Sequence, residues 1–151
     1  MILGIGIDII HLSRIQTLLL RKPTSLLHFS KRILSDGELK EFNIFLSNQK
    51  NNFSVNGLAQ NNLKQDKVII DNNIIRFLAV RWTLKEATYK ALFPHYHLIW
   101  KDISINKIEG KPQLIIHNAK QKGINNIKIH SSVSHDKEYI ISQVLIEGTI
   151  D

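Results

Sequence analysis

The sequence has no cysteine, only three prolines, and few aromatic residues, which make up 7% of the chain. The absence of cysteine excludes disulfide bonds, thiolate catalysis and cysteine-ligated metal sites. No apolar run approaches the roughly 18 residues that a membrane-spanning helix needs, so we expect no membrane span. The N-terminal stretch shows neither a leading basic region nor a cleavage-site pattern, and we therefore expect no removable presequence.

Two common phosphate-binding loops are also missing. The chain has no Gly-x-x-x-x-Gly-Lys-Ser/Thr loop, and Gly4-Ile5-Gly6 is too short to count as Gly-x-Gly-x-x-Gly. The length of 151 residues and the apolar share of 43% suit one soluble domain, covering residues 1–151. The 20 basic and 13 acidic residues give a net charge of +7, which favours nucleic acid, an acidic protein or a phosphorylated small molecule as partner.

The stretch from Arg76 to Leu92 predicts one long helix, with Pro94 just beyond its end. Its apolar stripe has alternating spacings of three and four and consists of Phe77, Val80, Leu84, Ala87 and Ala91. Trp82, Glu86 and Lys90 lie four apart on a second ridge. An exposed Glu86–Lys90 ion pair is the ordinary interpretation, worth only about 0.2–0.5 kcal/mol.

Residues Ile2 to Ile10 predict a buried strand with two unlike faces. Because side chains alternate, Leu3, Ile5, Ile7 and Ile9 are expected to face the core. The other face, with two glycines and then Asp8, would leave a bare floor where a ligand could approach the backbone. A carboxylate in an apolar strand is costly unless it is paired or binds a metal, although Asp8 could simply end the strand and cap the next turn.

The remaining segments predict an α+β fold, in which an antiparallel sheet packs on the long central helix. We expect helices over Arg14–Leu20, capped by Ser13, and over Asp36–Leu46, opened by a Ser35–Glu38 capping box, with a helical turn between them. The Asn-rich tract 47–75 is too polar to order well and predicts an exposed insertion or loop. The predicted later strands are Leu98–Asn106, Gln113–His117, Ile127–Ser134 and Tyr139–Glu147.

One candidate site combines the first strand with the long helix. If the ridge of Glu86 and Lys90 faces that strand, two carboxylates converge with a lysine beside them. Two carboxylates completed by water and phosphate oxygens suit Mg²⁺, and the lysine could neutralise a phosphate or a leaving group, which favours phosphoryl chemistry. His135, beside Ser132 and Ser134, could hold an anionic group, although a histidine in a turn is more often simply exposed.

Several blocks of the sequence resemble the holo-acyl-carrier-protein synthases, the small type of 4'-phosphopantetheinyl transferase, and they occur in the order of that family. These blocks are Gly4-Ile5-Gly6-Ile7-Asp8-Ile9-Ile10, Arg32-Ile33-Leu34-Ser35-Asp36-Gly37-Glu38, Arg76-Phe77-Leu78-Ala79-Val80-Arg81, Lys85-Glu86-Ala87-Thr88-Tyr89-Lys90-Ala91, Gly110-Lys111-Pro112 and Ser132-Val133-Ser134-His135. The resemblance implies transfer of phosphopantetheine from coenzyme A to a serine of an acidic acyl carrier protein, with release of adenosine 3',5'-bisphosphate. It also implies a role in fatty acid biosynthesis, within lipid metabolism, and a homotrimer whose sites are shared between neighbouring subunits.

The same resemblance assigns a role to each matching residue. Asp8 and Glu86 would bind Mg²⁺, and Glu86, directly or through a metal-bound water, would take the serine proton. Lys90 would stabilise the pyrophosphate or the leaving group, and Arg14 would grip the carrier protein. The remaining residues would bind coenzyme A, mostly around its nucleotide end: Arg81, Lys111, Pro112, Ser134 and His135.

Two segments depart from the family pattern. Leu92–His97 stands where the family has a glycine-rich turn, and the tract 47–75 resembles Asn-rich insertions of some fungal proteins. A mitochondrial location is therefore expected if the chain is fungal, and a cytoplasmic one otherwise.

Two rival functions stay open from the residues alone. One is a Mg²⁺-dependent nuclease, but nuclease sites often place Glu and Lys two apart on a strand, whereas here they are four apart on a helix. The other is a non-catalytic RNA-binding module, which the small aromatic share weakens. We therefore expect neither nucleic acid nor a membrane as partner.

Overall fold

The computed structural model describes residues 1–55 and 70–150. Its larger sheet has three antiparallel strands in the order β1-β5-β4, formed by Ile2–His11, Tyr139–Ile150 and Ile124–Asp136. A smaller two-stranded sheet consists of β2, Ile103–Ile108, and β3, Lys111–Ile116. The β2–β3 hairpin turns at Glu109 and Gly110, whose φ angles are both positive, as a tight two-residue hairpin turn requires.

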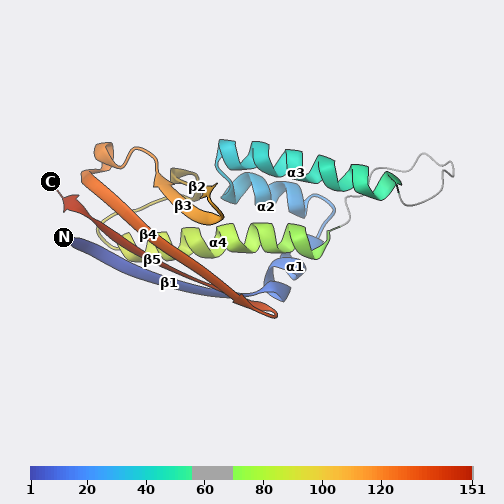
Figure 1. The fold of residues 1–151 in the computed structure, drawn as a ribbon, viewed down its shortest axis with the longest axis horizontal. Coiled ribbons are helices and arrows are strands. Elements are labelled where there is room, and N and C mark those ends of the chain that lie inside the picture. Colours follow the sequence, from blue (N-terminus) through green and yellow to red (C-terminus); the bar gives the residue numbers. More distant parts are fainter. Residues whose placement is uncertain (56–69, 151) are drawn as a thin grey trace.

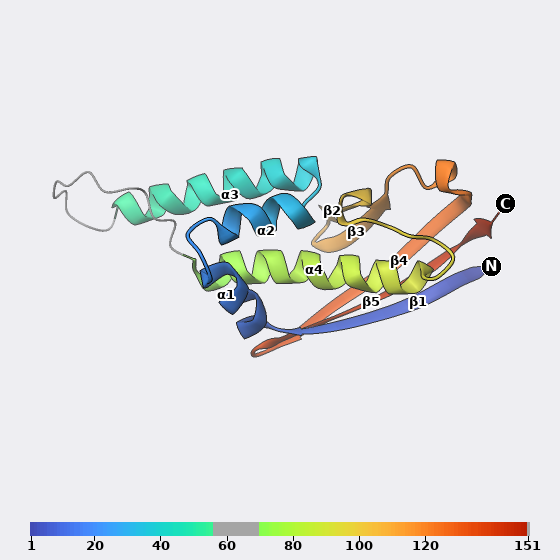
Figure 2. The ribbon, with the colours of Figure 1, turned by 180° about the vertical axis from the view of Figure 1, so that it is seen from behind.

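In the described part of the chain, four helices accompany these sheets: α1, Leu12–Leu20; α2, Ser25–Ile33; α3, Asp36–Val55; and α4, Asn72–Leu92. Two short 3₁₀ turns follow, η1 at Trp100–Asp102 and η2 at Lys120–Lys122. Figures 1 and 2 show α4 in the middle, with the three-stranded sheet crossing one side and α2 and α3 on the other. This arrangement confirms the predicted α+β fold with an antiparallel sheet on a long central helix. Within the described residues, no helix combines the length and the hydropathy needed to cross a membrane.

The central position of α4 explains why most of its circumference is buried. Its first half joins the apolar cluster of α1, α2 and α3, and its second half joins the cluster formed by both sheets. The predicted helix is confirmed, but it begins at Asn72 because the Asp71 carboxylate caps it, accepting a hydrogen bond from the Ile74 amide at 2.9 Å.

The predicted faces of β1 were wrong in orientation. Ile5, Ile7 and Ile9 are more than half exposed, whereas the face of Gly4, Gly6 and Asp8 turns towards α4. The glycine face is therefore covered by a helix and offers no bare floor to a ligand. Alternation distinguishes two faces but does not say which one is buried, and glycines here admit a helix rather than a ligand.

Other predicted boundaries also need correction. The tract 47–75 was predicted as a loop, but α3 continues through Val55 and α4 starts at Asn72; residues 56–69 lie outside the described part. A helix tolerates polar residues when neither Gly nor Pro interrupts it, and residues 38–55 contain neither. The residues before β2 form η1 instead of strand, and α1 begins one residue before the predicted cap Ser13, because His11 caps it.

The capping box and the hairpins are as predicted. The Glu38 carboxylate accepts a hydrogen bond from the Ser35 amide at 2.8 Å, while the Glu38 amide faces the Ser35 hydroxyl at 3.5 Å. The β4–β5 hairpin turns at Lys137 and Glu138, so His135, predicted near a turn, lies within strand β4.

Candidate active site

The site exists because β1 and α4 approach each other through their main chains. A Cβ added to Gly4 would lie 1.8 Å from the Ala91 carbonyl oxygen, and one added to Gly6 would lie 1.8 Å from that of Ala87. Only glycine permits this approach. Asp8 lies two residues after Gly6 on the same face of β1. The close approach therefore brings Asp8 beside Glu86 and Lys90, which precede Ala87 and Ala91 on α4.

Asp8 and Lys90 meet at this contact. The Lys90 ammonium donates to the Asp8 carboxylate at 2.8 Å and to the Ile7 carbonyl oxygen at 3.1 Å. The Asp8 side chain is 14% exposed and that of Lys90 47% exposed. Sequence spacing suggested an ion pair between Lys90 and Glu86, but among the described contacts the lysine pairs with Asp8 instead.

Glu86 shares this environment. Its side chain is half-buried, and burial raises its pKa above the ordinary value of 4.5. The negative charge of Asp8 raises the pKa of Glu86 further, while the cations Lys90 and Arg14 act in the opposite direction. The charges of Asp8, Lys90 and Arg14 thus all act on Glu86.

Arg14 lies in the first turn of α1, which contains no acidic residue. A cation there opposes the helix dipole, so the helix itself gains nothing from it. Its side chain is exposed, and its charge lowers the pKa of Glu86. Arg14 therefore stands at the solvent edge of the site, where an acidic molecule could reach it.

The donors around this site fit Mg²⁺. Within residues 1–55 and 70–150, no group of three or more histidines or carboxylates is suited to a metal ion. The crowded charges of Asp8 and Glu86 nevertheless form the small carboxylate set that Mg²⁺ accepts when water and phosphate oxygens complete its shell. The raised pKa of Glu86 is the supporting observation, since a nearby cation would relieve the repulsion that contributes to it.

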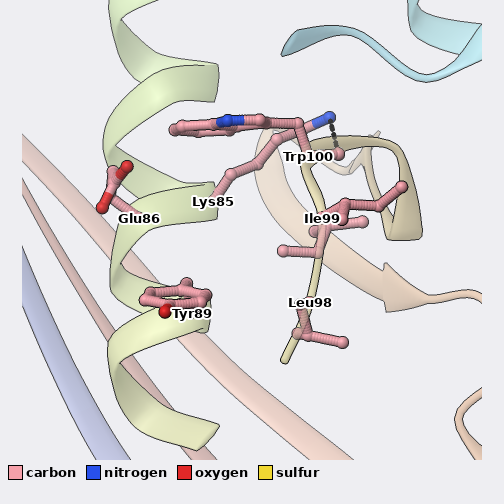
Figure 3. A pocket seen from close by; sticks show the side chains of 7 residues that line it. Lys85, Glu86, Tyr89, Leu98, Ile99 and Trp100 are labelled. Carbon is pink, nitrogen blue, oxygen red and sulfur yellow. Dashed lines mark hydrogen bonds between the residues drawn. The ribbon is translucent and has the colours of Figure 1, made fainter. Parts of the chain in front are cut away.

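A pocket of about 180 Å³ opens beside Glu86. Figure 3 shows the rings of Trp100 and Tyr89 on opposite sides of it, with Glu86 on α4 and the segment from Leu98 facing the helix. None of these aromatic or aliphatic wall residues was predicted from the sequence as part of a site. Leu98, Ile99 and Trp100 follow α4 in an irregular segment, which carries no periodic signal, whereas Tyr89 lies on α4 itself.

Lys85 on α4 also lines the pocket. Its ammonium is fully buried and donates to the Glu38 carboxylate at 2.6 Å, the Ile33 carbonyl oxygen at 2.6 Å and the Trp100 carbonyl oxygen at 3.0 Å. Burial lowers the pKa of Lys85, and the charge of Glu38 opposes that shift.

A sequence signal for Lys85 did exist. A second stripe with spacings of three and four runs along α4, and all its members are buried: Leu78, Arg81, Lys85, Thr88 and Leu92. A lysine within such a stripe indicates a buried cation that needs partners.

The other predicted ligands of coenzyme A lie apart from this site. Arg81 is buried, and its guanidinium pairs with Glu41 at 2.7 Å and with Glu38 at 3.4 Å. Lys111 is exposed at the start of β3, and the next residue, Pro112, accepts a hydrogen bond from Ser131 through its carbonyl oxygen.

Ser134 and His135 are exposed on β4, which β5 separates from β1. Among the described contacts, neither they nor Arg81, Lys111 and Pro112 touch Asp8, Glu86 or Lys90. The predicted roles of these five residues stay predictions.

Comparisons with known proteins show the family and the fold of this chain. Residues 4–144 match the model of the 4'-phosphopantetheinyl transferase superfamily. A holo-[acyl-carrier-protein] synthase of Anoxybacillus flavithermus is 33% identical over 150 residues, which cover 97% of both chains. The crystal structure of a Bacillus anthracis holo-(acyl-carrier-protein) synthase in complex with CoA (3',5'-ADP) superimposes with a TM-score of 0.62 at 28% identity, covering 99% of each chain. A Plasmodium yoelii holo-ACP-synthase gives a TM-score of 0.67 at 26% identity, covering 99% of this chain and 97% of its own.

Proposed function

The chain belongs to the 4'-phosphopantetheinyl transferase superfamily, and on that premise we propose that it is a holo-acyl-carrier-protein synthase. It transfers the 4'-phosphopantetheine arm of coenzyme A to a serine hydroxyl of an apo acyl carrier protein. The serine oxygen forms a bond to the β-phosphorus, the bond from that phosphorus to the bridging oxygen breaks, and adenosine 3',5'-bisphosphate leaves. The observation that carries the proposal is the meeting of Asp8, Glu86 and Lys90 at one β1–α4 contact in a chain of this family.

Glu86 is the group we propose to take the proton of the attacking serine. A general base works best when its pKa is close to the working pH, and burial and Asp8 both move the pKa of Glu86 upwards. The carboxylate is half-buried beside a pocket, so that a bound substrate would exclude water around it.

Lys90 is proposed to stabilise the charge that develops on the leaving phosphate. The Lys90 side chain is 47% exposed, so its ammonium can turn from Asp8 towards a bound phosphate without leaving the site. Mg²⁺, held by Asp8 and Glu86, would supply further charge stabilisation at the pyrophosphate when bound.

The acidic carrier protein is proposed to dock on α1 and α2. From Ile9 to Ser35 the chain contains no Asp or Glu, and its charged residues are all basic and exposed: Arg14, Arg21, Lys22, Lys31 and Arg32. Such a surface attracts an acidic partner over long range and accelerates its encounter. Arg14 lies where this surface reaches the site.

A homotrimer is proposed from the outer face of the three-stranded sheet. Ile5, Ile7, Ile9 and Ile141 are each 42% exposed or more, and register places Ile9 directly opposite Ile141. An exposed apolar face of this kind marks an interface between proteins. Copies of the same chain would cover it and could bring Ser134 and His135 of one subunit towards the site of another.

The deciding experiment measures the mass of a carrier protein. The full chain is incubated with apo acyl carrier protein, coenzyme A and Mg²⁺, and the carrier is then weighed by intact-protein mass spectrometry. A gain equal to one phosphopantetheine arm on the serine is expected, and no gain when that serine is replaced by alanine. A chain that modifies none of a bacterial, a mitochondrial and a polyketide-type carrier is not such a synthase.

A further inference from the structure

Ser142 on β5 carries the one buried hydroxyl that has no hydrogen-bond partner within residues 1–55 and 70–150. The residue is 1% exposed. The two other buried side-chain atoms without a hydrogen bond, Glu38 Oε1 and Arg81 Nε, face each other at 3.4 Å as an ion pair. Buried polar groups are nearly always paired, because an unpaired one has lost its hydration without compensation. The hydroxyl of Ser142 therefore calls for a partner.

The register of the sheet places Ser142 beside Asp8. The two residues lie directly opposite each other on β5 and β1, and β5 itself lies between β1 and β4 (Figure 2). Opposed side chains share one face of a sheet, with Cβ atoms about 4.5–5.5 Å apart. The other nearest neighbours of Ser142 along and across the strands are aliphatic: Ile140, Val144 and Val133. Among these neighbours, only Asp8 can accept a hydrogen bond through its side chain.

Asp8 will need a second donor during the proposed reaction. Its carboxylate accepts a hydrogen bond from the Lys90 ammonium at 2.8 Å, and no other donor reaches it from the part of the chain that the structure describes. The side chain of Asp8 is only 14% exposed, so its charge is costly without a partner. When Lys90 turns to a substrate phosphate, this donor is lost. A change of side-chain rotamer in Ser142 or Asp8 is enough to bring hydroxyl and carboxylate together across the strands.

We propose that Ser142 is a positioning residue for Asp8, an assignment that rests on the proposed function: its hydroxyl donates a hydrogen bond to the Asp8 carboxylate when Lys90 leaves it for the substrate phosphate. One Asp8 oxygen is then held by Ser142, and the other remains for Mg²⁺. Removing such a partner of a metal ligand typically weakens metal binding about 10–100-fold. In the free chain Lys90 occupies Asp8, which explains why the hydroxyl is unpaired there.

The first test removes Lys90 instead of moving it and needs no substrate. In the native chain, Ser142→Ala deletes an unpaired hydroxyl, so the melting temperature should stay the same or rise by up to about 4 °C. In Lys90→Met the hydroxyl should bond to the Asp8 carboxylate. There the same Ser142→Ala change should lower the melting temperature by about 4 °C or more, because a hydrogen bond to a charged group is lost. Circular dichroism at neutral pH measures both. Lys90 is half-exposed, so Lys90→Met is expected to fold.

Ser30 on α2 offers the matched control. It is 2% exposed, and its hydroxyl donates to the Leu27 carbonyl oxygen at 3.1 Å. Among the described contacts, it touches none of the charged residues of the site. Ser30→Ala should therefore shift the melting temperature equally in the native and the Lys90→Met chains.

The second test follows transfer to the carrier at a series of Mg²⁺ concentrations. Ser142→Ala should raise the Mg²⁺ concentration for half-maximal rate about tenfold or more, and most of the native rate should return at saturating Mg²⁺. Ser30→Ala should keep the native Mg²⁺ dependence. A purely structural role of the hydroxyl would not move the Mg²⁺ dependence in this way.

Two results would overturn the assignment. One is an equal effect of Ser142→Ala on the melting temperatures of the native and Lys90→Met chains, which means that the hydroxyl does not replace Lys90 at Asp8. The other is an unchanged Mg²⁺ dependence in Ser142→Ala. A native chain that modifies no carrier would instead overturn the proposed function, while the unfolding comparison would still show whether Ser142 bonds to Asp8.

Discussion

Glu86 is the residue on which the proposed chemistry depends most directly. Its replacement by glutamine keeps the shape but cannot accept a proton, so transfer should fall by about 10²–10⁴-fold, the usual contribution of a general base. Mass spectrometry of the carrier at timed intervals measures this loss. In the native chain, transfer should rise with pH as Glu86 loses its proton, because the base must be ionised to accept the proton of the serine. A Glu86→Gln variant that retains the native rate would remove Glu86 from the mechanism.

The raised pKa of Glu86 also has a consequence for stability. The folded chain holds this proton more tightly than the unfolded chain does, so ionisation of Glu86 favours unfolding. The free energy of unfolding should therefore fall as pH rises from the usual pKa of a glutamate through the raised pKa. Urea unfolding at a series of pH values should show this fall in the native chain and a smaller one in Glu86→Gln.

At this scale the sequence predicted a meeting of Asp8, Glu86 and Lys90 on the condition that the ridge of Glu86 and Lys90 faces the first strand. The structure meets that condition, since Lys90 contacts Asp8 and the charge of Asp8 acts on Glu86, while the catalytic and binding roles of these residues stay predictions. The pairing of Lys90 with Asp8 was missed, because spacing within a helix says nothing about a partner on another element. Trp100 was missed as a pocket wall because it lies in the irregular segment opposite α4, and Tyr89 on α4 was missed because the pocket it lines exists only where that segment packs against the helix.

The elements are joined at two places where a single substitution should be decisive. At Gly6, an alanine would push its Cβ to 1.8 Å from the Ala87 carbonyl oxygen, a backbone atom that cannot move away alone. We expect Gly6→Ala to lower the free energy of unfolding by about 3 kcal/mol or more, the upper range for overpacking. Thermal or urea unfolding measures the change.

Gly37 offers the matched control. It lies in the first turn of α3, and a Cβ added there meets nothing within 4 Å. Gly37→Ala should leave stability unchanged or raise it by up to about 1 kcal/mol. Equal losses in the two variants would mean that β1 and α4 are not held by close main-chain contact.

Lys85 is the second such place, since its ammonium ties the end of α2, the start of α3 and η1 to α4. Lys85→Met would leave the buried Glu38 carboxylate without its closest cation, which costs about 3–5 kcal/mol when a buried pair is broken. Adding Glu38→Gln should recover part of that loss, because the uncompensated charge is then gone. Urea unfolding of the single and double variants separates the two; a double variant weaker than either single one would contradict the pairing.

Elements with strong periodicity were predictable, and their packing partners were not. The long helix, the first strand and the capping box follow from spacing and local hydrogen bonding. The orientation of β1 could not be predicted in this way, because an isoleucine face of a strand is normally assigned to the core, and here it is exposed. A pattern was available: Gly4 and Gly6, two apart on a strand, match Ala87 and Ala91, four apart on a helix, as two small-residue faces suited to close contact.

At the scale of the whole molecule, residues 1–55 and 70–150 leave the isoleucine face of the three-stranded sheet uncovered, and the proposed trimer would bury it. Ile7→Glu should therefore reduce the assembled particle to a single chain, as measured by sedimentation equilibrium, while circular dichroism stays unchanged. Ile108→Glu, nearly equally exposed but on β2, should leave the assembly intact. If native and Ile7→Glu proteins have the same mass in solution, this face does not serve assembly.

Because β1 and α4 touch through their main chains at Gly4 and Gly6, the distance between Asp8 and Glu86 does not depend on how side chains pack elsewhere in the core. Asp8 and Glu86 stand on two backbones that rest directly on one another, with no side chain in between to be exchanged for a larger or smaller one. Core residues elsewhere can drift over evolutionary time and repack without altering the spacing of the acids. Gly4 and Gly6 cannot be replaced in this way, because any larger residue would push β1 away from α4 and change the distance between the two acids.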